Sequence, residues 1–346
     1  MPCSEPQAQL ANCKWCSCPA GLVCMSGTCA TDPRTVIATS EQKIESRILL
    51  DDGYVYWTTR APAGGYTNDV TFSINRVPKS GGTSNVVFAL DNSQIDMVAY
   101  DSSAHYIKVW RNTDTTSGNA WDAIIARIAY GATAYTLLID NFNTSVAPDL
   151  LAQTSSTLYF ENWFYQSDTN WLVGVDPPGG TGAPQWTQQV TGKVGHATVE
   201  GDVVRLVFGP FNGKLSLYSL SRNTGLVKGA TLPEQCYGIV RDSIEHDWIG
   251  VCGSVPLDVV RFSDSGAMQT IATGIVDATS LTLRGTELYW RESKTRNIRS
   301  FDLQTKQTKT IPLQKEDVVF AYDDAYVYYV NSTQILRTAF ATASSP

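Results

Sequence analysis

The sequence has few basic residues and no cluster of them. Lys and Arg together number 26 against 33 Asp and Glu, which gives a formal net charge of −7. Nucleic acids and anionic membrane surfaces are bound through concentrated positive charge, so neither is an expected partner. Long apolar runs are also missing, because the longest are of strand length whereas a membrane-spanning helix needs about 20 apolar residues. We therefore expect no membrane span.

Histidine and the common catalytic motifs are scarce as well. Only His105, His196 and His246 are present, and there is no G-x-S-x-G elbow, phosphate-binding P-loop or zinc-protease motif. Helical periodicity is missing too, since period-2 alternation and β-branched residues dominate. With 43% hydrophobic residues the chain can still bury a large core. These features favour an all-β protein and a binding function over an enzyme.

Cysteine, by contrast, is concentrated near the N-terminus. Six cysteines fall within residues 3–29, namely Cys3, Cys13, Cys16, Cys18, Cys24 and Cys29. An even number of closely spaced cysteines is typical of a disulfide-stapled module in an oxidised chain. We predict such a module over residues 1–31, with its connectivity open because six cysteines allow fifteen pairings. The alternative is a zinc site, which the lack of histidine in this segment disfavours.

The remaining two cysteines, Cys236 and Cys252, lie close to each other and far from the rest. They are equidistant from the centre of a predicted hairpin formed by residues 238–242 and 247–251. Cysteines that face each other across a hairpin are within bridging range, so we predict a disulfide here. The cysteine usage places the protein in an oxidising compartment, extracellular, periplasmic or on the cell surface. No leader is visible at Met1, and we expect a mature secreted form numbered without one.

From residue 46 onward one pattern recurs. A short apolar strand ends in a polar turn, and a second strand rich in Tyr and Trp follows at once. The seven copies begin near residues 47, 96, 149, 196, 238, 280 and 318. Each continues with further short strands, and four-stranded units at intervals of about 40–50 residues are the signature of propeller blades. We predict a seven-bladed β-propeller over residues 35–340, with a six-bladed ring as the alternative.

The two ends of the repeat region predict how the ring closes. The seventh copy has only three strands and finishes at residues 335–339, whereas residues 35–40 stand alone before the first copy. These residues resemble the fourth strand of another copy, residues 269–273. We predict that the N-terminal strand completes the last blade, because this closure leaves no open seam in the ring. The alternative is a linker strand.

The Tyr-Trp strands carry a family resemblance. Tyr56-Trp57-Thr58 and Tyr289-Trp290-Arg291 resemble the YWTD repeats of lipoprotein-receptor propellers, which have six blades, although the defining Asp is absent in both places. More broadly the chain resembles secreted bacterial propellers with VYW repeats, and residues 18–29 resemble the Cys-rich modules that precede domains of secreted bacterial proteins. The resemblance implies a fold and leaves the chemistry open.

The connections between the second and third strands are long in the first three copies. They cover residues 59–71, 111–122 and 163–171 and should share one face of the ring. In or beside them lie the aromatic residues Tyr66, Trp110, Trp121, Trp163, Phe164, Tyr165 and Trp171. Aromatic surfaces bind sugars, peptides and proteins. We predict an extracellular binding protein whose partner is a glycan, a peptide or a secreted protein; the alternative is that these rings pack beneath the loops.

A second candidate site is the mouth of the central channel. The residues at or before the start of the first strands are Glu45, Asp96, Asp149, His196, Tyr237, Asp277 and Asp317. Such a ring is suited to a basic ligand group or to Ca²⁺. It also offers His196, with Asp149 or Glu45, as a general base for a lyase or hydrolase, the alternative function. Further alternatives are a solvated channel without a ligand and a structural role in an extracellular assembly through self-association.

Overall fold

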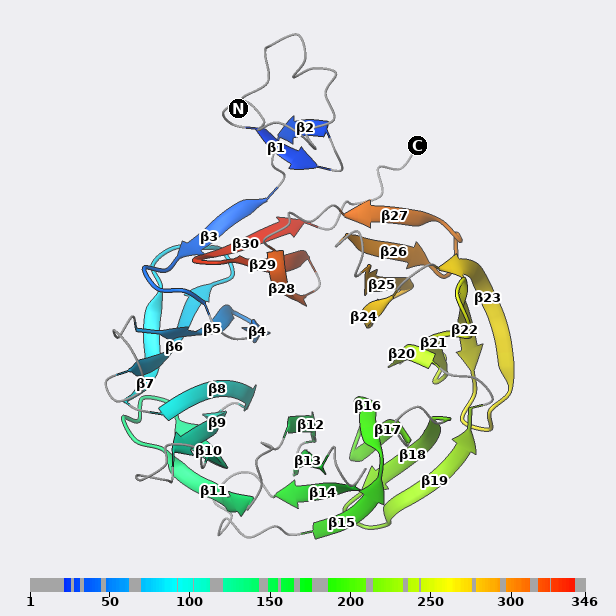
Figure 1. The fold of residues 1–346 in the computed structure, drawn as a ribbon, viewed down its shortest axis with the longest axis horizontal. Helices are drawn as coiled ribbons and strands as arrows, with labels where there is room; N and C mark the ends of the chain where they lie inside the picture. Colours follow the sequence, from blue (N-terminus) through cyan, green and yellow to red (C-terminus); the bar gives the residue numbers. More distant parts are fainter. Residues whose placement is uncertain are drawn as a thin grey trace.

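A computed structural model describes most of the chain as strands and tight turns (Figure 1). The described residues are 22–25, 28–31, 34–44, 48–61, 70–91, 93–101, 103–112, 121–142, 149–154, 157–164, 169–175, 186–209, 214–232, 236–242, 244–275, 278–292, 297–311, 317–323 and 325–339. Within these ranges there is no helix, and so no helical segment with the length and apolarity to cross a membrane.

Seven four-stranded antiparallel sheets are arranged as blades around one axis (Figure 1). Blade 1 contains β4 (Leu49–Leu50), β5 (Tyr54–Arg60), β6 (Thr71–Pro78) and β7 (Asn85–Asp91). Blade 2 contains β8 (Ser93–Tyr100), β9 (Ala104–Asn112), β10 (Trp121–Ala129) and β11 (Thr136–Phe142). Blade 3 contains β12 (Asp149–Gln153), β13 (Leu158–Phe164), β14 (Thr169–Val175) and β15 (Trp186–Thr191). In each blade the first strand is innermost.

The remaining blades follow the same order. Blade 4 contains β16 (Lys193–Glu200), β17 (Val203–Gly209), β18 (Ser216–Ser221) and β19 (Gly225–Thr231). Blade 5 contains β20 (Cys236–Arg241), β21 (Trp248–Cys252), β22 (Leu257–Phe262) and β23 (Met268–Ile275). Blade 6 contains β24 (Thr279–Arg284), β25 (Glu287–Arg291), β26 (Ile298–Asp302) and β27 (Thr308–Ile311). The ring therefore has seven blades, and the six-bladed alternative is wrong.

Blade 7 is built from both ends of the ring, as the sequence predicts. Its inner strands are β28 (Asp317–Tyr322), β29 (Tyr326–Asn331) and β30 (Gln334–Ala339), and its outer strand is β3 (Thr35–Thr39). β3 runs antiparallel to β30, with Thr35 opposite Arg337 and Thr39 opposite Gln334. The closing strand is also tied to blade 1, because the amide of Gly82 donates to the carbonyl of Ile37 at 3.3 Å.

The Cys-rich segment contributes one described hairpin. β1 (Leu22–Met25) pairs with β2 (Thr28–Thr31), and Cys24 lies directly opposite Cys29 in the register. The other four predicted bridging residues, Cys3, Cys13, Cys16 and Cys18, lie outside the described residues. The pairing within this module stays a prediction.

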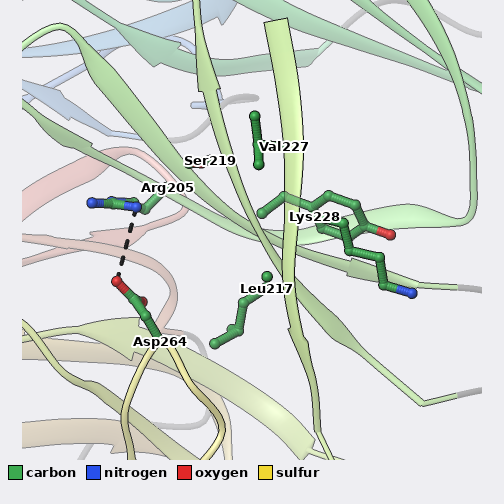
Figure 2. Close-up of a pocket in the computed structure, with 8 residues that line it drawn as sticks. Arg205, Leu217, Ser219, Val227, Lys228 and Asp264 are labelled. Carbon is green, nitrogen blue, oxygen red and sulfur yellow. Dashed lines mark ion pairs between the residues drawn. The ribbon is translucent and has the colours of Figure 1, made fainter. Parts of the chain in front are cut away.

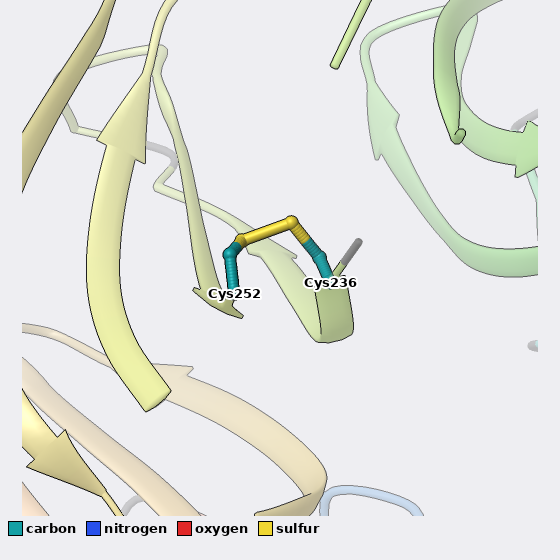
Figure 3. Close-up of a disulfide and its surroundings, with 2 residues drawn as sticks. All are labelled: Cys236 and Cys252. Atoms are coloured by element: carbon teal, nitrogen blue, oxygen red, sulfur yellow. A yellow bond between two sulfur atoms is a disulfide. The ribbon is translucent and has the colours of Figure 1, made fainter. Parts of the chain in front are cut away.

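The predicted remote disulfide is confirmed. Cys236 and Cys252 face each other across the first hairpin of blade 5, with a Cα–Cα distance of 4.0 Å and an S–S bond of 2.04 Å (Figure 3). The bridge closes a loop across a sequence separation of 16 residues. It lies at the end of the hairpin away from the β20–β21 turn, so it fixes the register of the two innermost strands.

The repeated Tyr and Trp residues of the second strands form the core between blades. Trp57, Tyr289 and Trp290 are 3% exposed or less. One cluster joins Trp57 of blade 1 to Tyr328 of blade 7 and to Ile37 of the closing strand. Large aromatic side chains bury the most apolar area per residue, so the recurrent motif is explained by packing between blades.

The turn between the first and second strands carries a repeated polar contact that the sequence analysis missed. In blade 1, Oδ1 of Asp51 accepts the amides of Gly53 and Tyr54, at 2.8 and 2.6 Å, and Oδ2 accepts the hydroxyl of Tyr56 at 2.6 Å. Asp101 in blade 2 makes the same contact with Tyr106 at 2.6 Å. An Asx turn is thereby locked to the buried ring five residues later.

Asp323 repeats the arrangement in blade 7, where it accepts the hydroxyl of Tyr328 at 2.7 Å. Burial alone would raise the pKa of Asp323, but hydrogen bonds from the turn amides, Tyr328 and Lys79 outweigh it and lower the pKa. Burial and the nearby carboxylate together raise the pKa of the Tyr328 hydroxyl. Asp323, like Asp101, is therefore an ionised acceptor that belongs to the scaffold.

Candidate functional site

The blades are of unequal height on the face where second strands connect to third strands. The β9–β10 hairpin of blade 2 has nine residue pairs, and the corresponding hairpins of blades 1 and 3 have seven. Blades 4, 5 and 6 have only five. His105 aligns with Val204 of blade 4 and Trp248 of blade 5, so one of the nine pairs, Ala104↔Ala129, lies toward the opposite face and three extra pairs lie on this one. Three additional pairs at about 3.3 Å each extend the described hairpin of blade 2 by about 10 Å beyond those of blades 4 and 5.

Several predicted binding residues lie on this raised part, but in strands rather than in loops. Trp110 is in β9, Trp121 begins β10, Trp163 and Phe164 end β13, and Trp171 is in β14. The prediction that the connections begin at residues 111 and 163 was wrong, because strand pairing continues through Asn112↔Trp121 and Phe164↔Thr169. Tyr66 and Tyr165 lie outside the described residues.

Trp171 is the aromatic side chain that is most clearly available on this side. It is 39% exposed and its Cα partners on the flanking strands are Asn162 and Gln189. Trp110 is partly buried, and the ammonium of Lys108 lies 5.6 Å from the centre of its ring. The side chains of Trp121, Trp163 and Phe164 lie outside the described part. Trp171 thus offers a flat apolar surface among polar neighbours, as binding aromatics do.

The channel mouth is described only in part. Asp96 lies in β8, where it is partly buried and opposite Lys108. Three more of the predicted residues lie in first strands, but their side chains are outside the described part: Asp149 in β12, Tyr237 in β20 and Asp317 in β28. Glu45 and Asp277 lie outside the described residues. Among the residues that are described, no three His, Cys, Asp or Glu side chains are grouped as metal ligands would be. The Ca²⁺ site therefore stays a prediction.

His196 lies in β16 and packs toward the next blade. Its ring meets that of Trp248 edge-on, with 6.2 Å between the ring centres. Burial lowers the pKa of His196 to about 4. The imidazole is therefore neutral near pH 7, and its conjugate acid is too strong for it to be an effective general base there.

The other two histidines lie on the opposite face of the ring. His246 is exposed, whereas His105 at the start of β9 is only 2% exposed. Burial lowers the pKa of His105 to about 4, the Arg76 charge lowers it further, and the charges of Asp51 and Asp101 act weakly in the opposite direction. His105 and the partly buried His196 are both neutral at pH 7.

These two histidines predict acid sensitivity. An unfolded chain binds a proton on each near pH 6.5, whereas the folded chain does so near pH 4. The contribution of the two neutral histidines to the free energy of unfolding is therefore fully present above pH 6.5. It is lost as the pH falls from 6.5 to 4, by up to about 3 kcal/mol for His105. Urea denaturation at pH 7, 5.5 and 4.5 gives the slope of the unfolding free energy against pH. His105→Leu should flatten it, and the exposed control His246→Gln should leave it unchanged; equal slopes in all three proteins would contradict the prediction.

A network of charges joins blades 4 and 5 on the same face as His105. Arg241, whose side chain is 3% exposed, bonds Glu200 at 2.7 Å and Asp264 at 2.8 Å, and its guanidinium lies 5.0 Å from the centre of the Trp248 ring. Burial alone would raise the pKa of Glu200, but hydrogen bonds from Arg241 and Arg205 outweigh it and lower the pKa. These charges are paired within the protein and hold two blades together.

A small pocket lies beside this network (Figure 2). Arg205 approaches Asp264 at 3.8 Å across the blade seam, and Val227 and Lys228 of the outer strand form the other wall. Its volume of about 80 Å³ suffices for a few waters only. It is a gap next to an internal ion network and not a candidate for ligand binding.

No protein-family model matches the sequence, and no curated protein matches it. Solved structures match the fold. The WD40 β-propeller domain of Doa1 is 13% identical, with a TM-score of 0.54 over 90% of this chain and 98% of that one. BamB from Moraxella catarrhalis is 12% identical, with a TM-score of 0.52 over 90% and 99%. Acylaminoacyl peptidase from Pyrococcus horikoshii is 10% identical, with a TM-score of 0.58 over 88% of this chain and 53% of the peptidase.

These likenesses establish the β-propeller fold and nothing finer. At such low identity the activity of a neighbour does not transfer to this chain. No family match supports the resemblance to YWTD repeats or to Cys-rich bacterial modules. Propellers in general mediate interactions.

Proposed function

We propose that the chain is an extracellular or periplasmic binding protein that holds a glycan, a peptide or a secreted protein against the raised side of blades 1 to 3. The observation that carries this proposal is the one-sided height of the β9–β10 hairpin together with the exposed ring of Trp171. A packed scaffold does not require either feature, since blades 4 to 6 close the same ring with shorter hairpins. The Cys236–Cys252 bridge supports an oxidising compartment.

The raised side also has the chemistry of a binding surface. Tryptophan is over-represented among residues that dominate binding energy, because it combines a large apolar face with one polar hydrogen. Trp110 of blade 2, with the Lys108 ammonium 5.6 Å from the centre of its ring, adds a second aromatic face on this side. The alternative lyase or hydrolase function has weaker support, because His196 has a pKa of about 4 and packs against Trp248.

The test is a binding screen with paired variants. The protein is applied to a glycan array and a displayed peptide library, and the affinity of each hit is then measured by calorimetry. Trp171→Ala should weaken a specific hit about 30-fold or more, since an interface tryptophan commonly contributes about 2 kcal/mol or more. The matched control is Ile244→Ala, which removes a 66% exposed apolar side chain from the opposite face.

Two outcomes would contradict the proposal. One is that the screens return no ligand whose binding depends on Trp171. The other is a large fall in melting temperature for Trp171→Ala without a specific loss of affinity, which would make that ring part of the core.

A further inference from the structure

A cavity of about 250 Å³ lies at the seam between blades 1 and 2, on the face opposite the raised side. It is lined by Arg76, Asn85, Val86 and Val87 of blade 1 and by His105, Ile128, Ala129, Tyr130, Gly131 and Ala132 of blade 2. A closed cavity of about 150 Å³ holds one benzene molecule, so this one has room for a somewhat larger organic ligand.

The most unusual residue of the lining is His105. It is 2% exposed, and its ring stands edge-on to the rings of Tyr56 and Tyr130, at 5.2 and 4.7 Å between centres. Neither ring nitrogen has a hydrogen-bond partner within the described residues. A buried polar group without a partner destabilises the fold, so packing does not explain why an imidazole occupies this position.

Comparison between blades shows what the fold itself needs at this position. His105 is the residue just before the recurrent Tyr of the second strand. The corresponding residues are Val55, Leu158, Val204, Leu288 and Val327, and each is 0% exposed. In blade 5 the position is taken by the buried Trp248. Five blades place Val or Leu here and the Trp248 Nε1 is paired with Asp264, whereas both ring nitrogens of His105 lack a partner within the described residues.

Arg76 is the cationic residue of the lining, while the charges of Asp51 and Asp101 also act on His105 and Tyr130. The Arg76 guanidinium lies 4.4 Å from the centre of the Tyr54 ring, and no carboxylate in the described part of the chain is within ion-pair distance of it. The arginines at the same position in other blades are engaged: Arg127 donates to the Ser103 hydroxyl at 3.1 Å and Arg337 donates to the Lys79 carbonyl. Arg76 also lies beside the Tyr56 hydroxyl, which donates to Asp51 at 2.6 Å, so its guanidinium stands between that pair and the cavity.

We propose that this cavity is a binding site for a small organic carboxylate with an apolar body. The carboxylate lies against the guanidinium of Arg76 and accepts the ring N–H of His105, which is neutral and has one donor and one acceptor nitrogen. Val86, Val87 and Ile128 cover the hydrocarbon part, and the half-exposed ring of Tyr130 forms the outer wall. The site is independent of the proposed partner surface on the other face.

Benzoate is the probe, because it has an aromatic body slightly larger than benzene and one carboxylate. The full chain, labelled with ¹⁵N-histidine, is titrated with benzoate at pH 7 while the ring resonances are followed by NMR. We expect a saturable shift of the His105 signals, with those of His196 and His246 unmoved. Benzamide, which has the same shape without the charge, should bind about tenfold more weakly or worse.

Two variants separate a ligand site from a core residue. His105→Leu restores the residue type of the other blades, so it should abolish benzoate binding while leaving the melting temperature unchanged or higher. Arg76→Gln should weaken benzoate about ten- to a hundredfold, because a hydrogen-bonded charge is lost. The matched control, Lys228→Gln, removes a positive charge at the other pocket and should change nothing.

The proposal is overturned if benzoate produces no saturable shift at His105, if benzamide binds equally well, or if Arg76→Gln binds as the unaltered protein does. Each of these results would show that the cavity is not a site for a carboxylate held by Arg76 and His105. Should His105→Leu fail to fold, the imidazole belongs to the core, and the binding measurement on Arg76→Gln decides the assignment.

Discussion

A chain that begins at Glu41 should lose at least about 4 kcal/mol of unfolding free energy, because the seventh blade loses its outer strand. Ile37, which is 4% exposed, packs in one cluster with Trp57 of blade 1 and Ile335 of blade 7. Removing such a buried side chain alone costs about 2–5 kcal/mol. The deletion also exposes the backbone of β30 as an open edge. Domains typically have an unfolding free energy of about 5–15 kcal/mol, so the deletion should remove a large fraction of the total.

The matched control is a chain that begins at Arg34, which lacks the Cys-rich segment but keeps β3. We expect its unfolding free energy to stay within about 1 kcal/mol of the full chain, because terminal segments tolerate removal unless they are tied into a sheet. Chemical denaturation of the three proteins gives the comparison. If the two truncated chains are equally stable, closure by β3 does not support the ring.

The second large effect is expected from Arg241→Met. Arg241 is almost fully buried between blades 4 and 5, and its loss leaves Glu200 and Asp264 without their closest cation. Glu200 and Asp264 are 20% and 48% exposed and keep Arg205 nearby, so the cost comes from the lost hydrogen bonds between charged groups, about 1.5–3 kcal/mol. The cation lying against Trp248 is lost as well. We therefore expect a fall of that size in the unfolding free energy.

Arg205→Met provides the comparison, since Arg205 contacts the same two acids at 3.0 and 3.8 Å with its side chain 30% exposed. A partly exposed pair contributes about 0–1 kcal/mol, so this variant should be nearly as stable as the unaltered protein. Denaturation curves with equal slopes allow the two free energies to be compared. Equal losses in both variants would show that the burial of Arg241 does not determine how much the network contributes to the unfolding free energy.

The architecture was predictable because its unit is local. Each blade is a series of hairpins, so apolar alternation and polar turns within about 45 residues reveal it without any long-range pairing. Closure by β3 was predictable for the same reason, since residues 35–40 have the pattern of a fourth strand that the last copy lacks. The Cys236–Cys252 bridge was predictable because the two cysteines are equidistant from the centre of one hairpin.

Strand ends and side-chain environments were not predictable in this way. Pairing at Asn112↔Trp121 depends on the register and twist of the whole hairpin, which local sequence does not specify, so the tryptophans there were assigned to loops. The packing of His196 against Trp248 depends on contact between two blades. The sequence does carry a signal for His105: aligned copies place Val or Leu at its position in five other blades, which marks the imidazole as an exception.

The antiparallel pairing of β3 with β30 has a mechanical consequence. Thr35 lies opposite Arg337, so the segments that leave the ring at its two ends depart from the same end of one strand pair. A pull on both ends loads the hydrogen bonds of this pair one after another, as in opening a zipper, instead of shearing them together. Tension carried through the whole chain should therefore peel blade 7 apart at low force.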